Sequence, residues 1–173
     1  NVERAFWNAL DDLESEGFQY KMIDMPSLST AVEAYYVIAM SEASSNLARF
    51  DGVRYGNRSD KGNDWNQNFS ESRGEAFGEE VKRRVMLGTY ATSEGYKDDY
   101  YQKAQHIRES IRSEFDSKFN EVDMVATPTM PVEPFKIGES LDDPLKMYLA
   151  DANTTPVNLA NLPAISVPTR QKS

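Results

Sequence analysis

The segment from Ala34 to Gly56, AYYVIAMSEASSNLARFDGVRYG, constrains the fold more than any other part of the chain. Between Ala39 and Ala48 the segment is rich in alanine and serine. Because it has few bulky side chains there, a helix formed by these residues allows a second backbone to approach closely. The helix is followed by a loop of arginine, aspartate, aromatic rings and glycines, and glycine permits tight backbone turns. The segment therefore predicts a closely packed helix that ends in a charged loop.

The hydrophobic pattern predicts an alternation of helices and short strands. Apolar residues recur at the helical spacing, which predicts helices over residues 5–17, 28–48, 74–95 and 96–120 and after Pro144 up to the break at Thr155 and Pro156. Short apolar runs bounded by proline or glycine predict strands over residues 18–23, 122–127 and 162–168. Residues 57–73 lack a sustained period and are expected to form an exposed loop with one helical turn at most.

Composition limits the class of protein. The 173 residues suit one domain, residues 1–173, and no apolar run is long enough to span a bilayer. A formal charge of −9 repels nucleic-acid phosphates, so direct RNA binding is not expected. Solubility is the simpler explanation of this charge, and a salt-adapted host is the alternative. With no cysteine and no leader pattern, a cytoplasmic location is expected.

A complete catalytic set is not found from residue types alone. His106 is the only histidine and stands on a polar helix, where a surface role is the simpler interpretation. The paired acids 98–99 and 142–143 stand at expected helix starts, where carboxylates favour the helix dipole, so no metal site is expected. No serine lies in a nucleophile elbow, and no glycine-rich loop has the lysine of a phosphate site. No cofactor is therefore expected in this chain.

Three long motifs carry a resemblance to a known family. They are the segment from Ala34 to Gly56, then GEEVKRRVMLGTYATSEGYKDDYYQKAQHIR, then DPLKMYLADANTTPVNLANLPAISVP. Together they resemble the amidase signature family, and within it the C-terminal part of the A subunits of tRNA-dependent glutamyl and aspartyl amidotransferases. The resemblance implies an α/β fold with a mixed β-sheet flanked by helices. It also implies a lysine and two serines as catalytic residues, and their signature segment has no counterpart in this chain.

The resemblance further implies which residues face the substrate, glutamine. Matched position by position, they are Tyr35, Arg84 and Asp151. On a helical wheel Arg84 falls on the edge of the apolar stripe of its helix, so it is expected to be the most buried of the three bases at 82–84, and a planar guanidinium suits an α-carboxylate. From this helix alone, however, a structural salt bridge is the simpler interpretation. Asp151 lies in the last turn of its helix, where a carboxylate opposes the dipole, which indicates a second role such as binding an α-ammonium group. An exposed acid without a role is the alternative. Without the resemblance, Tyr35 would be a packing residue.

The resemblance also implies partners and a reaction. A serine of the whole protein attacks the glutamine amide and releases ammonia, which a partner subunit uses to amidate the aminoacyl-tRNA. This partner is the B subunit, which uses ATP and magnesium. A C subunit completes the assembly, and the chain's contact with tRNA is mainly indirect. Two alternatives stay open: a stand-alone amidase acting on another small amide, and a non-catalytic docking fragment.

Overall fold

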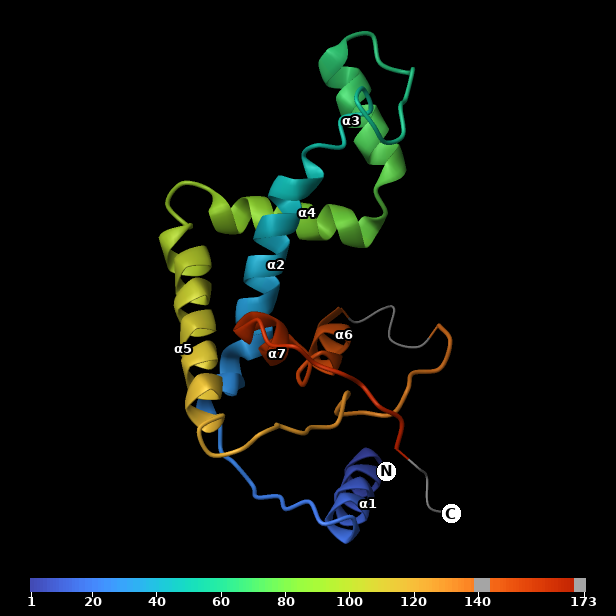
Figure 1. The fold of residues 1–173 in the computed structure, drawn as a ribbon. Coiled ribbons are helices and arrows are strands. Elements are labelled where there is room, and N and C mark those ends of the chain that lie inside the picture. The colour runs from blue at the N-terminus through green and yellow to red at the C-terminus, as the bar shows by residue number, and fades with distance from the viewer. Residues whose placement is uncertain (139–143, 170–173) are drawn as a thin grey trace. The chain divides into compact units, whose positions relative to one another are not determined.

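The computed structural model describes residues 1–138 and 144–169 and is built of helices joined by irregular segments (Figure 1). The chain divides into two compact units. The first unit is Asn1–Tyr35 with His106–Ser173, and the second is Tyr36–Gln105. The boundaries fall within helix α2 (Ala31–Leu47) and helix α5 (Lys103–Lys118). The assignment of residues 1–173 to one domain stays a prediction.

In the first unit, the N-terminal helix confirms the expected periodicity. Helix α1 (Val2–Ser15) buries Leu10, and the chain leaves it through Gly17, whose φ of +95° is a left-handed conformation that glycine adopts easily. The short helix η1 (Pro26–Thr30) leads directly into α2. Ser27 donates its backbone N–H to Glu114 Oε2 at 3.0 Å and its hydroxyl to the same oxygen, which ties η1 to α5.

The C-terminal helices of this unit differ from the prediction at one point. Helix α5 buries Ile111 and Phe115 as expected. Helix α6 (Pro144–Ala150) is followed by a turn and then by helix α7 (Thr155–Ala160), so Thr155 and Pro156 begin a helix rather than only ending one. The reason is that proline is favoured in the first turn of a helix, where its missing N–H is not needed. The acids at 142–143 lie outside the described residues.

The three predicted strands are wrong for the residues that the structure describes. Residues 18–23, 122–127 and 162–168 are irregular, and no β-strand is assigned in 1–138 or 144–169. A strand exists only through hydrogen bonds to a neighbouring strand, and these segments form no such ladder within the described residues. Their apolar side chains stay largely exposed: Met124 at 73%, Ile165 at 86% and Val167 at 65%. The mixed sheet of the expected α/β fold is therefore not observed in the described part of this chain.

In the second unit, α2 and helix α4 (Glu79–Thr92) pack backbone against backbone. A Cβ placed on Gly88 would lie 1.9 Å from the carbonyl oxygen of Met40 and 2.9 Å from the nitrogen of Ser41. Only glycine fits here, which confirms that the small-residue helix admits a close neighbour. Beyond α4 the chain turns at Gly95 into the π-helical turn η2 (Asp98–Gln102). There Tyr90 packs on Tyr96, with ring centroids 4.5 Å apart.

The segment predicted as a loop contains a full helix, so that prediction is wrong. Helix α3 (Trp65–Ala76) begins at Asp64, whose side chain accepts a hydrogen bond from the backbone N–H of Gln67. The helix is polar, so it lacks the apolar period that marks a helix in a sequence. It is held instead by specific side-chain contacts: the Arg73 guanidinium lies over the rings of Phe69 and Phe77 at 5.0 and 4.6 Å.

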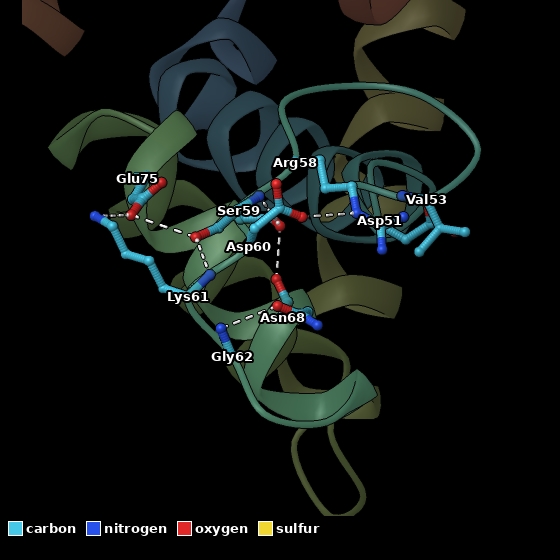
Figure 2. Close-up of polar contacts among 10 residues, drawn as sticks. Asp51, Val53, Arg58, Ser59, Asp60, Lys61, Gly62, Asn68 and Glu75 are labelled. Carbon is cyan, nitrogen blue, oxygen red and sulfur yellow. Dashed lines mark hydrogen bonds and ion pairs between the residues drawn. The ribbon is translucent and has the colours of Figure 1, made fainter.

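Polar contacts fasten the preceding loop to α3 (Figure 2). Lys61 pairs with Glu75 at 2.6 Å, and the N–H of Gly62 donates to Asn68 Oδ1 at 3.0 Å. At the start of the loop, the carboxylate of Asp51 accepts from the backbone N–H groups of Arg54 and Val53, both at 2.9 Å. These bonds, together with the Arg54 side chain, lower the pKa of Asp51 to about 2.

Within residues 1–138 and 144–169, no helix combines the length and the apolar character needed to cross a bilayer.

Candidate functional site

The first of the predicted site residues, Arg84, lies in the second unit on α4. This helix starts after Gly78 and carries Glu79 and Glu80 in its first turn, where their charges favour the helix dipole. Arg84 is four residues after Glu80, so the two side chains meet on one face of the helix. Arg84 Nε donates to Glu80 Oε1 at 2.8 Å, and Arg83 pairs with the other oxygen of the same carboxylate.

Arg84 is also held from a second element. Its guanidinium lies over the ring of Tyr36, 5.6 Å from the centroid, and Tyr36 is a buried residue of α2. A cation over the face of an aromatic ring is stabilised by the ring quadrupole. The guanidinium is thus fixed at one edge by a carboxylate and on one face by a ring, which sets both its plane and its direction.

Burial alone does not single out Arg84, contrary to the expectation from the helical wheel. The side chains of Lys82, Arg83 and Arg84 are 38%, 46% and 39% exposed, so the three bases are similar. What distinguishes Arg84 is its contact with Tyr36. The structural salt bridge considered from sequence does form, with Glu80. A guanidinium has five N–H donors, so a pair through Nε is compatible with carboxylate binding by the same group.

Asp151 lies in the first unit, in the turn between α6 and α7. Its backbone carbonyl accepts from the N–H groups of Thr154 and Thr155, both at 3.0 Å, so the turn is closed around this residue. Asn153 donates to the carbonyl of Pro128 at 2.8 Å and fastens the turn to the irregular segment before it. Asp151 itself is half-buried at the C-terminal end of α6, as the sequence predicted. Asp151 therefore follows the C-terminal end of α6, whose dipole disfavours a carboxylate, and precedes the start of α7, whose dipole favours one.

The tyrosine pair is divided between the two units. Tyr36 is buried and meets Arg84, whereas Tyr35, the residue chosen from the resemblance, is half-buried and belongs to the first unit. The second unit therefore joins Arg84 with Tyr36 and Glu80, neither of which was proposed from sequence. An i, i+4 pair of glutamate and arginine was visible in the sequence and would have indicated Glu80. A shared site of Tyr35, Arg84 and Asp151 stays a prediction.

A polar hollow of about 450 Å³ lies in the second unit beside the crossing of α2 and α4. Its walls carry hydroxyl groups, and those of Ser44 and Thr89 are 2.8 Å apart. Small residues of α2 thus line this hollow, next to the place where Gly88 of α4 meets the backbone of α2. The lining residues are Ser41, Glu42, Ser44, Ser45, Thr89, Thr92, Lys97 and Tyr101.

Comparison with known proteins identifies relatives over nearly the whole chain. The amidase family model matches residues 1–173. The A subunit of the glutamyl-tRNA(Gln) amidotransferase of Haloarcula marismortui is 64% identical over 167 residues, which cover 96% of this chain and 39% of that relative. The protein of the same name from Brevibacillus brevis is 55% identical over 167 residues, 96% of this chain and 34% of the relative. The chain therefore spans well under half the length of these relatives.

A solved structure agrees with the sequence comparison. The crystal structure of the A subunit of the glutamyl-tRNA(Gln) amidotransferase from Thermotoga maritima superimposes with a TM-score of 0.62 at 38% sequence identity. The match covers 92% of this chain and 29% of that chain. The resemblance drawn from the three motifs is confirmed at the level of the family.

Proposed function

The chain belongs to the amidase family, and from this premise we propose that it is part of the glutamine-hydrolysing A subunit of a tRNA-dependent amidotransferase. The observation that carries the proposal is the 64% identity to such a protein over 96% of the chain. In the whole protein, a serine attacks the side-chain amide of glutamine, an acyl-enzyme forms and ammonia is released. Those catalytic residues have no counterpart among the 173 residues here.

The role proposed for this chain is to hold glutamine by its charged end. Arg84 binds the α-carboxylate, Asp151 binds the α-ammonium group, and Tyr35 lies against the substrate. The geometry supports the first assignment, because Glu80 and Tyr36 give the Arg84 guanidinium one defined orientation. The half-buried place of Asp151 in the closed turn between α6 and α7 supports the second. A zwitterionic amino acid needs both charges, whereas the apolar amide of a stand-alone amidase needs neither.

The proposal extends to the sheet and to the partners. We infer that the segments 122–127 and 162–168 pair with strands of the whole protein, since their exposed side chains Met124, Ile165 and Val167 are apolar. The whole protein would act in the cytoplasm as one member of a heterotrimer with B and C subunits. ATP and magnesium would be used by the B subunit, which would also make the main contact with tRNA.

Substitution in the full-length protein, assembled with its partners, tests the substrate role. Arg84→Ala and Asp151→Ala should each raise the KM for glutamine about tenfold to a hundredfold, because each removes a charge-assisted hydrogen bond. Arg83→Ala is the matched control, since Arg83 shares the helix and the Glu80 carboxylate with Arg84, whereas the cation over Tyr36 is Arg84. Unchanged glutamine kinetics in both test variants would refute the assignment. Preference for an apolar amide over glutamine in the unaltered protein would favour the stand-alone amidase.

A further inference from the structure

The carboxylate of Glu80 contacts two arginine side chains of its own helix. It accepts from Arg84 Nε at 2.8 Å and also from Arg83, so it binds two neighbouring guanidinium groups at once. All three side chains are more than a third exposed, and ion pairs of that exposure contribute little to folding. The pairing has a larger effect on geometry, because a bond through Nε fixes the plane of the Arg84 guanidinium and the direction of its terminal N–H groups.

A second contact acts on the same group from another helix. The ring of Tyr36 lies 5.6 Å from the Arg84 guanidinium carbon, so the face of the group is constrained by α2 while its Nε edge is constrained by α4. Two constraints from two elements remove most of the rotational freedom of a long, flexible side chain. Binding a carboxylate to a guanidinium that is already oriented costs less entropy than binding it to a free one.

We propose that Glu80 is a positioning residue that orients the Arg84 guanidinium for the α-carboxylate of glutamine, an inference that rests on the function proposed above. Glu80 touches the arginine rather than the substrate, so it acts on substrate binding and not on the bond that breaks. Its removal should raise the KM for glutamine and leave kcat nearly unchanged.

The chain offers a closely matched control for Glu80. Glu79 is the preceding residue, shares the first turn of α4 and its dipole, and also pairs with a base. That base is Lys82 rather than Arg84, at 3.3 Å, and the Glu79 side chain is 88% exposed. Any effect of acid removal on helix α4 itself should therefore appear in Glu79→Ala as much as in Glu80→Ala.

The experiment measures glutamine hydrolysis by the full-length protein in complex with its partners. Glu80→Ala should raise the KM for glutamine about tenfold with kcat within about twofold. Glu80→Gln should recover about half of that effect on a logarithmic scale, because an amide oxygen still accepts from Arg84 Nε. Glu79→Ala should leave both constants within about twofold of the unaltered protein. An equal KM for Glu80→Ala and Glu79→Ala would overturn the inference.

A second ligand separates positioning from a general loss of structure. 4-Aminobutanamide has the amide and the ammonium group of glutamine but lacks the α-carboxylate. Its inhibition constant should be the same in Glu80→Ala as in the unaltered protein, because the positioned guanidinium has no carboxylate to bind. If Glu80→Ala weakens the inhibitor as much as glutamine, the role is structural and the inference fails.

Arg84→Ala separates the substrate role of Arg84 from the positioning role of Glu80. If Arg84→Ala leaves the KM for glutamine unchanged, the proposed substrate role of Arg84 is wrong, whatever Glu80 does. If Arg84→Ala raises the KM and Glu80→Ala does not, the substrate role stands and only the positioning role of Glu80 is refuted. In the double variant, loss of Glu80 should add no further increase, since its effect passes through Arg84.

Discussion

Gly88 of α4 meets the carbonyl of Met40 of α2 so closely that a Cβ on Gly88 would lie 1.9 Å from the carbonyl oxygen. No real side-chain atom occupies such a position, and the obstacle is backbone, which cannot rotate away as a side chain can. The crossing of the two helices, and with it the neighbourhood of Arg84 and Tyr36, depends on this glycine. The small residue that permits this contact is Gly88 of α4, and the backbone atoms that it meets belong to Met40 and Ser41 of α2.

Gly88→Ala should therefore lower the free energy of unfolding by about 3 kcal/mol, because the helices must separate to admit the methyl group. Urea unfolding of the full-length protein measures this change. Gly74→Ala is the control, since within residues 1–138 and 144–169 the added Cβ on α3 meets nothing within 4 Å beyond its chain neighbours and its own helix backbone. It should raise stability by up to about 1 kcal/mol through helix propensity. Equal stability of the two variants would contradict the packing described.

Arg73 should resist conservative replacement. Its Nη1 donates to the carbonyls of Leu47 and Phe50 at 2.7 and 3.2 Å, and its planar group lies over the rings of Phe69 and Phe77. A lysine ammonium cannot make the same bonds and stack as a plane, so Arg73→Lys should cost about 1–2 kcal/mol of unfolding free energy.

Arg58→Lys provides the comparison for Arg73. Arg58 forms an exposed pair with Asp60 at 3.4 Å, and its replacement should change the unfolding free energy by less than about 0.5 kcal/mol. Denaturant unfolding of the two variants side by side measures the difference. If both replacements are neutral, Arg73 does not fasten α3 to the end of α2.

Thr155 should tolerate loss of its hydroxyl. The side chain is buried, and Oγ1 has no hydrogen-bond partner among residues 1–138 and 144–169. Because a buried unsatisfied hydroxyl is costly, Thr155→Val should leave the unfolding free energy unchanged or raise it by about 1 kcal/mol. Thr154→Val is the contrast, since its hydroxyl donates to the Asp151 carbonyl at 3.2 Å and its loss should destabilise. Thermal unfolding of the two variants measures the difference. A clear loss of stability in Thr155→Val would show that the Thr155 hydroxyl has a hydrogen-bond partner.

Asp51 should make folding sensitive to acid in a narrow range. Its pKa is lowered to about 2, first by the backbone N–H of Arg54, then by that of Val53, and then by the Arg54 side chain. Since the folded pKa lies below the unfolded value, the ionised carboxylate stabilises the protein above about pH 4, and this contribution is lost as the pH falls towards 2. Carbon-13 NMR titration of the Asp51 carboxyl group measures the folded pKa directly.

Arg54→Ala tests the order of these causes. The backbone bonds remain when the side chain is removed, so the pKa of Asp51 should rise but stay below its ordinary value of 3.8. A return to the ordinary value in this variant would show that the guanidinium, rather than the backbone, controls the carboxylate.

The helices were predictable wherever one face of the helix is apolar. Helix α1 and the middle of α5 follow the expected ranges, because residues such as Leu10, Ile111 and Phe115 recur at the spacing that buries one face. Helix α2 also follows its expected range, although its apolar residues surround the helix rather than form one face. Helix α3 was missed because it is mostly polar and depends on Arg73 and on the loop bonds at Lys61 and Gly62. Such contacts join residues that a local period does not connect.

The strands were predicted from the sequence but are not observed in the described residues, whereas helix α3 is observed but was not predicted. Apolar runs such as residues 122–127 and 162–168 have the composition of buried strands, but a strand also requires a partner. Composition is a property of the segment, whereas pairing is a property of what lies beside it. In the described residues these segments are irregular. We therefore infer a mixed sheet only for the whole protein, where other strands would pair with them.

The sequence by itself determined the family, the helices with an apolar face and the close approach that α2 permits. Each of these depends only on the types of residue and their spacing along the chain. Only the tertiary structure decided that Arg84 lies over Tyr36, that Glu80 holds its Nε, and that Gly88 is where α4 meets α2. Tyr36 and Arg84, like Met40 and Gly88, are far apart along the chain. Their meeting depends on the path of the backbone between them, which local spacing does not specify.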